Sequence, residues 1–203
     1  MKLPVSFLIS ALLLLISSTP SLSLAISPLE GIEALRSTLE GITDFTADFS
    51  QEKRISLLKR PISTNGSIKF KKPDVFLMKT RPPFEGEILM RDNLIEQKLG
   101  GENRRNRLIL SSDQGLKKWF SKLSIPMKKI PDDMAIQAEL NDSLYTLAIS
   151  PKGKGSLKKI TVSFHKNGEI RRLVISEKNG DSSILTLKNM KLNQGLSEKD
   201  FKF

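Results

Sequence analysis

The strongest constraint on the fold is a regular alternation of apolar and polar residues, broken by short polar turns. The alternation runs through residues 159–193, and Asn-Gly pairs at 167–168 and 179–180 interrupt it. Asn-Gly between alternating runs is the strongest short-range sign of a hairpin, since both residues tolerate a positive φ. The sequence therefore predicts successive antiparallel strands, whose shared apolar face another element has to cover.

The same period of two recurs in residues 44–80, where Pro73 interrupts it once. Side chains two positions apart share a face of a strand, so apolar residues are expected on one face and basic residues on the other. On this prediction Lys69 and Lys71 meet water. The apolar residues of the first face are Phe45, Ala47, Phe49, Ile68, Phe70, Phe76 and Met78.

A different period precedes these strands. Apolar residues recur every three or four positions from Leu29 to Ile42, which predicts an amphipathic helix over residues 28–43. Ser27 and Pro28 suit its start. A helix with one apolar stripe has to lie against another element. We therefore expect a mainly β fold with α, in which helices cover one face of a long antiparallel sheet.

The first 25 residues have the layout of a secretory signal peptide. Lys2 is followed by an apolar run from Val5 to Ile16, and Ser23 and Ala25 place small residues before a cleavage site. The alternative is an uncleaved anchor, but the run is shorter than the roughly 20 residues that a spanning helix needs. Cleavage leaves residues 26–203 as a single domain with a sizeable core.

The chain is strongly basic, with a formal net charge of +11 at pH 7. Such a charge favours an anionic partner, for example lipid headgroups or lipopolysaccharide, or it is simply a solvated surface. Export argues against nucleic acid, and so does the even spread of the basic residues along the chain. We therefore expect no nucleic-acid partner.

The residues for catalysis are scarce. The chain has no cysteine and one histidine, His165, which stands just before a predicted turn. It has no Gly-x-Ser-x-Gly elbow, phosphate-binding glycine loop or His-Glu-x-x-His motif. A zinc site without cysteine and with one histidine is unusual. The sequence predicts a binding protein and not an enzyme, with no cofactor and no metal.

The middle of the chain, residues 103–134, mixes charged residues with apolar ones. Residues 114–123 fit a short helix, and Pro126 and Pro131 favour a loop after it. Such an apolar segment beside a sheet either covers the mouth of a pocket or seals the core, and the pattern leaves both open. Its large apolar side chains include Trp119, Phe120 and Met127.

Two stretches carry a family resemblance. The first reads FTADFSQEK from Phe45, and the second reads GSIKFKKPDVFLMKTRPP from Gly66. With the terminal Phe-x-Phe at 201–203, they resemble the LolA family of periplasmic outer-membrane lipoprotein carriers, over roughly residues 29–203. The matching positions are Phe45, Ala47, Phe49, Gln51, Gly66, Ile68, Phe70, Lys71, Lys72, Pro73 and Phe76.

The resemblance implies an incomplete antiparallel β-barrel, a strongly curved sheet closed by a helical lid over an apolar cavity. It also implies that acyl chains of lipoproteins occupy the cavity during passage through the periplasm. An inner-membrane ABC transporter is then the donor and an outer-membrane receptor is the acceptor, with a monomeric carrier between them.

The resemblance also assigns roles to residues. The family commonly has arginine at the position of Lys72, where it ties the sheet to carbonyls of the lid, so Lys72 is the candidate lid latch. Lysine donates from a point charge instead of a planar fork, which predicts a weaker latch. The expected lining of the cavity is Phe45, Phe49, Ile68, Phe70, Phe76, Met78, Leu89, Trp119, Phe120 and Met127.

Departures from the family pattern keep other cargo open. After Asp92-Asn93 the chain continues without the aromatic residues that the family often has there. One alternative is a carrier of the same fold for a glycolipid, phospholipid or fatty-acyl product. Another is a periplasmic sensor that binds a lipoprotein and transports nothing.

Overall fold

A computed structural model describes residues 24–100, 105–111, 117, 121 and 125–203 of the chain. Residues 1–23 of the predicted signal lie outside this range. The predicted cleavage point, after Ala25, falls within the first described strand, β1 (Leu24–Ile26). The signal and the single domain after it remain predictions.

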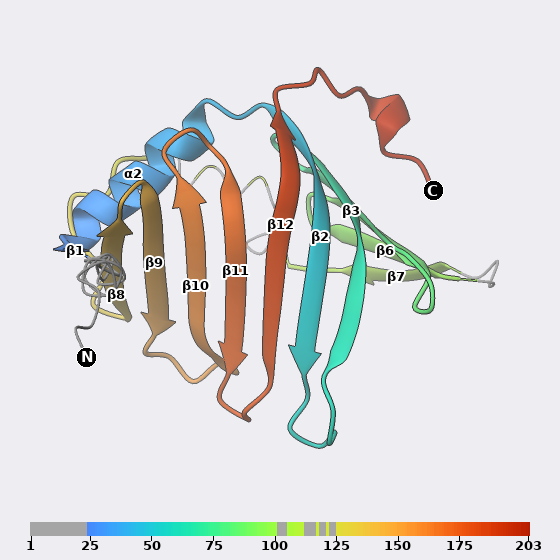
Figure 1. The fold of residues 1–203 in the computed structure, drawn as a ribbon, viewed down its shortest axis with the longest axis horizontal. Coiled ribbons are helices and arrows are strands. Elements are labelled where there is room, and N and C mark those ends of the chain that lie inside the picture. Colours follow the sequence, from blue (N-terminus) through green and yellow to red (C-terminus); the bar gives the residue numbers. More distant parts are fainter. Residues whose placement is uncertain (1–23, 101–104, 112–116, 118–120, 122–124) are drawn as a thin grey trace, which may run out of the picture.

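The described chain folds around one twelve-stranded antiparallel sheet with the order β1-β8-β9-β10-β11-β12-β2-β3-β4-β5-β6-β7 (Figure 1). β1 and β7 stand at its two edges, so the sheet does not close. This confirms the incomplete antiparallel barrel. The other strands are β2 (Asp44–Arg54), β3 (Ile62–Lys71), β4 (Val75–Thr80), β5 (Gly86–Arg91), β6 (Leu94–Leu99), β7 (Arg105–Ile109), β8 (Met134–Asn141), β9 (Leu144–Pro151), β10 (Leu157–His165), β11 (Ile170–Glu177) and β12 (Ser182–Leu192).

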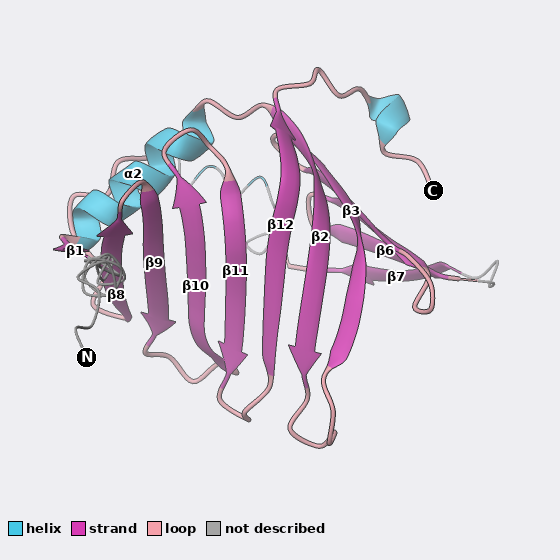
Figure 2. Ribbon diagram, viewed as in Figure 1, coloured by secondary structure: helices cyan, strands magenta, loops and turns pink. Residues whose placement is uncertain are grey.

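Helix α2 (Pro28–Glu40) corresponds to the predicted helix and ends three residues earlier. Pro28 stands in its first turn, where the missing N–H costs no intrahelical bond. The helix runs across one end of the sheet (Figure 2), and a short 3₁₀ helix, η2 (Glu198–Asp200), lies near the C-terminus. At the other end of α2, Gly41 caps the helix, and the chain continues into β2.

The two Asn-Gly turns form hairpins as predicted. Gly168 joins β10 to β11 with a φ of 100°, and Gly180 joins β11 to β12 with a φ of 93°. Gly66 in β3 serves another purpose, because a Cβ there would come within 1.8 Å of the Lys79 carbonyl oxygen. The absence of a side chain therefore lets β4 approach β3 closely.

Strand register divides the sheet into two faces. We call the face that carries Phe45 and Phe49 the inner face, and the one that carries Lys69 and Lys71 the outer face. Residues directly opposite each other on paired strands share a face. One row of the inner face crosses β2 to β7 through Phe45, Phe70, Phe76, Met90, Ile95 and Leu108.

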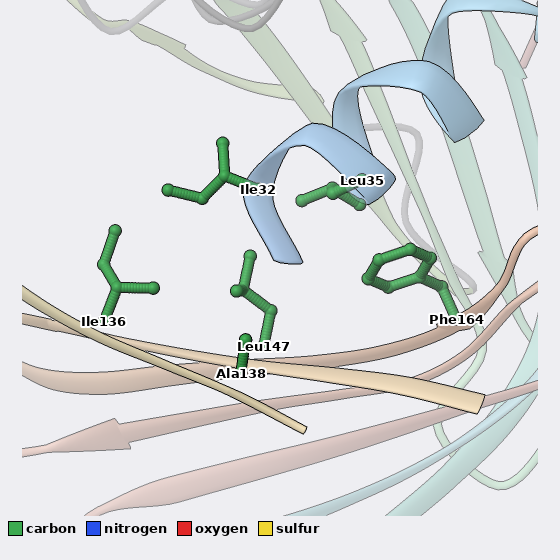
Figure 3. Packing of buried hydrophobic residues seen from close by; sticks show 6 residues of the cluster. All are labelled: Ile32, Leu35, Ile136, Ala138, Leu147 and Phe164. Atoms are coloured by element: carbon green, nitrogen blue, oxygen red, sulfur yellow. The ribbon is translucent and has the colours of Figure 1, made fainter. Parts of the chain in front are cut away.

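The buried residues of the described ranges form three apolar clusters. In the first, Ile32 and Leu35 of α2 point at Leu147 and Phe164 of the inner face (Figure 3). The second lies further along the same face, on β12, β2 and β3, and contains Ala47, Phe49, Ile68 and Leu187. The third lies on the outer face, where Val75, Leu77 and Leu89 of β4 and β5 pack against Phe201 near the C-terminus.

Candidate functional site

The inner face brings together six of the residues predicted to line a cavity. Phe49, Ile68 and Phe70 are buried, and Phe45, Phe76 and Met78 are half-buried. All six lie on neighbouring strands β2, β3 and β4, and the Phe45 and Phe70 rings stand 5.3 Å apart. The sequence therefore located the apolar patch correctly, and its role as a cavity wall remains a prediction.

This apolar face continues beyond the predicted residues. Ile88, Met90 and Ile95 are half-buried on β5 and β6, and Leu108 on β7 is 56% exposed. The face is therefore buried deeply at its centre and becomes more accessible towards the β7 edge. Flexible side chains such as Met90 adapt to apolar groups of different shapes.

The position predicted for Leu89 is wrong. Phe76 faces Met90 across β4 and β5, whereas Leu89 faces Leu77. Leu89 therefore lies on the outer face, 5% exposed, in one cluster with Phe201. Neighbouring apolar residues at 88–90 hide the phase of the strand, so the sequence alone did not show which of them point inward.

Of the remaining predicted lining residues, the structure describes Met127. Met127 is 37% exposed in the segment before β8 and belongs to none of the three clusters. Trp119 and Phe120 lie outside the described residues. Their contribution to the inner face stays a prediction.

Lys72 connects the sheet to the helix. Its Nζ donates to the carbonyl oxygens of Leu39 and, at 3.3 Å, Glu40, which are the last two residues of α2. Carbonyls of the last turn have no partner within the helix, and a cation there also interacts favourably with the helix dipole. Burial lowers the pKa of Lys72, and the neighbouring Glu40 carboxylate opposes this shift. The geometry is that of a contact between the β3–β4 turn and the C-terminus of α2.

A second connection at the same end was not predicted. Asp44 at the start of β2 is 4% exposed, and its carboxylate accepts hydrogen bonds from the backbone N–H of Gln194 (2.7 Å) and Gly195 (3.1 Å). Asn193 accepts from the Thr43 N–H (2.8 Å) and donates to the Gly41 carbonyl (2.9 Å). These bonds join the exit from α2 to the end of β12.

The outer face is covered where we expected water. Lys71 Nζ donates to the Leu196 carbonyl (2.8 Å), and Lys69 donates to the Asp200 carbonyl (3.4 Å). Phe201, 1% exposed, fills the space above β4 and β5. The two lysines are therefore half-buried and meet water only in part, because the C-terminal segment, residues 196–203, lies over them.

Further basic residues hold the same segment. Arg91 donates to the Glu198 carboxylate (2.7 Å) and to the Phe201 carbonyl (3.1 Å). The Arg105 guanidinium lies 4.8 Å from the centroid of the Phe203 ring. The continuous apolar run at 75–78 is the signal that sequence reasoning missed, since such a run is typical of a strand buried on both faces.

His165 contacts the neighbouring turn. Its Nδ1 lies 3.1 Å from the Ser143 carbonyl oxygen, at the end of β10. Across the described ranges, no three His, Cys, Asp or Glu side chains lie close enough to hold a metal ion. In the same ranges, none of the helices combines the length and apolar character that crossing a bilayer requires.

The fold and the inner face define a class of protein, an open antiparallel β-barrel with a helix packed on an apolar interior surface. A model of the family of outer membrane lipoprotein carrier protein LolA matches residues 40–203. The chain belongs to this family, which confirms the resemblance found in its sequence. The members for which this family is named are carrier proteins and not enzymes.

Individual relatives agree with this placement. The chain is 25% identical over 193 residues to an outer-membrane lipoprotein carrier protein of Actinobacillus pleuropneumoniae serotype 3, covering 88% of this chain and 82% of that protein. It is 24% identical over 206 residues to the carrier protein of Pasteurella multocida, covering 94% and 92%. The fold is similar to the crystal structure of an uncharacterized conserved protein from Thermus thermophilus, with a TM-score of 0.53, 11% identity and coverage of 86% and 93%.

Proposed function

We propose that the chain is a periplasmic carrier that binds the acyl chains of lipoproteins against its inner face and takes them from the inner to the outer membrane. The observation that carries this proposal is the apolar row across β2 to β7, which passes from the buried Phe70 to the exposed Leu108. Membership of the carrier family and the names of the relatives support it.

The energetics explain why lipoproteins need a carrier. Each CH₂ group removed from water contributes about 0.8 kcal/mol, so one long acyl chain holds its lipoprotein in a membrane by roughly 10 kcal/mol. A carrier has to offer comparable apolar contact and still release the chain. A half-buried face with methionines at 78 and 90 suits that task better than a rigid pocket does.

The resemblance supplies the other participants. We propose an inner-membrane ABC transporter as the donor, an outer-membrane receptor as the acceptor, and a monomeric carrier between them. In this scheme α2 acts as part of the lid. The contact of Lys72 with the end of α2 then contributes to the closed arrangement and has to loosen when cargo enters.

The test is mass spectrometry of lipids extracted from the purified chain. Triacylated lipoprotein peptides are the expected cargo. Free glycolipid or phospholipid alone would contradict the lipoprotein as cargo and identify another lipid in its place.

A pair of variants tests the inner face as the binding site. Met90→Gln places a polar group on the inner face and should lower the lipid load severalfold. Leu94→Gln is the matched control, because Leu94 is half-buried on the outer face and should leave the load unchanged. Equal losses in both variants would contradict the inner face as the binding site.

A further inference from the structure

Three loops lie together at one end of the sheet, the lower end in Figure 1. They join β2 to β3, β9 to β10 and β11 to β12, and we call them the basic end, defined by residues 53–60, 152–159 and 177–181. Hydrogen bonds connect them. The Ser56 N–H donates to Asp181 (2.8 Å), and Lys178 donates through its N–H to the Ser156 carbonyl (2.8 Å) and through Nζ to the Gly153 carbonyl (2.6 Å). The three loops therefore form one continuous surface.

Positive charge predominates on this surface. Its three segments contain nine Lys and Arg residues against two acidic ones, Glu177 and Asp181. Within the described part of the chain, Arg54 pairs with Glu52 (3.0 Å), whereas Lys59, Arg60, Lys152 and Lys154 take part in no ion pair. The turns at the opposite end, residues 72–74, 142–143 and 166–169, contain two basic and three acidic residues.

A pair of acidic residues borders the basic end next to β9. The Lys152 N–H donates to the Asp133 carbonyl (2.7 Å), which places the pair Asp132 and Asp133 next to β9. Asp132 already pairs with Lys129 (3.4 Å). Away from this border, the β2–β3 loop at residues 53–60 contains four basic residues and no acidic one.

Two exposed leucines lie in the β2–β3 loop, between basic residues of the basic end. The Leu58 N–H donates to the Ile55 carbonyl (2.8 Å), which closes a turn and holds Leu57 at its tip. Leu57 is 92% exposed and Leu58 is 49% exposed. Arg54, Lys59 and Arg60 flank the turn in sequence and are all exposed.

We infer that the basic end docks on the surface of an anionic bilayer, with Leu57 inserted among the acyl chains and the cations against the headgroups. An apolar tip flanked by exposed basic residues matches the two layers of a membrane interface, the apolar acyl chains and the negatively charged headgroups. A protein partner fits less well, since lysine is depleted from protein–protein interfaces. The inference goes beyond the carrier proposal and does not depend on the identity of the cargo.

The test is flotation of the purified chain with two kinds of vesicle. One contains phosphatidylethanolamine and phosphatidylglycerol, and the other contains phosphatidylcholine alone. We expect binding to the first kind, weakened by salt because the headgroup attraction is screened. Equal binding to both kinds would overturn the charge recognition, and binding to neither would overturn the proposal in favour of an acidic protein surface.

Variants separate the leucine tip from the charge. Lys59→Gln with Arg60→Gln should weaken binding by about tenfold or more, since each basic residue near an anionic surface contributes about fivefold. Leu57→Ser should weaken binding by about tenfold as well, with little change in its salt dependence. Lys166→Gln with Lys188→Gln is the matched control, because both lysines are exposed away from the basic end and should leave binding unchanged. Equal binding by the three variants would overturn the proposal.

The same variants distinguish this inference from the carrier proposal. Leu57→Ser should keep the extracted lipid load, and Met90→Gln should keep the affinity for anionic vesicles. If Met90→Gln abolished vesicle binding in the folded protein, lipid uptake on the inner face would account for the flotation, and the basic end would lose its assigned role.

Discussion

At the scale of single residues, Lys72 links the family motif in β3 to the proposed lid, because it contacts the last carbonyls of α2. The side chain crosses from the β3–β4 turn to the helix end, where Leu39 and Glu40 accept its hydrogen bonds. A lysine makes this contact as a point donor. A planar guanidinium fork offers more donors to the same carbonyls.

We predict that Lys72→Met lowers the free energy of unfolding by about 1–3 kcal/mol, the range for hydrogen bonds from a charged donor. Chemical denaturation measures this change, and hydrogen exchange should show faster exchange in α2. Lys72→Arg should preserve both values or raise them. Lys166→Met, on an exposed turn, is the control for loss of a lysine charge. If Lys72→Met behaves like this control, the contact contributes nothing to closure.

At the scale of elements, the C-terminal segment is bound to the outer face by both apolar and polar contacts. Phe201 is buried with Leu89, while Asp200 accepts hydrogen bonds from the N–H (2.8 Å) and hydroxyl (3.0 Å) of Ser197. These hydrogen bonds lower the pKa of Asp200 below its ordinary value of 3.8, and the positive charge of Lys69 lowers it further. The short helix η2 therefore depends on an ionised carboxylate.

This dependence predicts that the segment loosens in acid. A carboxylate whose pKa is lower in the folded state stabilises that state above its ordinary pKa, and the stabilisation disappears as the pH falls through the folded-state pKa. The NMR signals of the Phe201 ring should therefore broaden or shift as the pH falls below 3.8. Asp200→Asn should show a weakened segment already at neutral pH, without the acid transition. An unchanged transition in Asp200→Asn would assign it to another group.

At the scale of the whole molecule, the sheet is bent, and two of its neighbouring strands approach each other closely. Gly66 lies where β4 meets β3, and the Lys79 carbonyl occupies the place that a side chain would take. The bend turns β6 and β7 away from the plane of β8 to β12 (Figure 1). The apolar row of the inner face follows it.

We predict that Gly66→Ala lowers the free energy of unfolding by about 2–3 kcal/mol, because a backbone carbonyl has to move and little else can relieve the overlap. Thermal or chemical unfolding measures the loss. Gly153→Ala is the control, since a Cβ there meets nothing within 4 Å. Similar stabilities of the two variants would show that the strand pair has room to adjust.

Much of this organisation could be predicted from local patterns. The alternation at 159–193 and the Asn-Gly pairs specify β10 to β12 and their turns, because side-chain direction along a strand and a positive φ are properties of neighbouring residues. The stripe from Leu29 to Ile42 specifies α2 for the same reason. The patch around Phe49 and Phe70 followed from the same alternation.

The incorrect predictions concern contacts between distant parts of the chain. Leu89 and Met90 are adjacent and both apolar, so only the pairing of β5 with β4 decides which one points inward. Lys69 and Lys71 look like a fully hydrated face in sequence, but residues 196–203 return to cover them in part. Nothing in the local sequence around these lysines indicates that the C-terminal segment lies there.

The sequence by itself determined the strands within residues 44–80 and 159–193, the helix, the Asn-Gly turns and the apolar character of the inner face, because these depend on residues a few positions apart. Only the tertiary structure decided which segments cover each face, how Asp44 joins β2 to the turn after β12, and that three basic loops meet at one end of the sheet. These features arise when distant segments pack together, and the free energy that selects such an arrangement comes from burial over the whole chain.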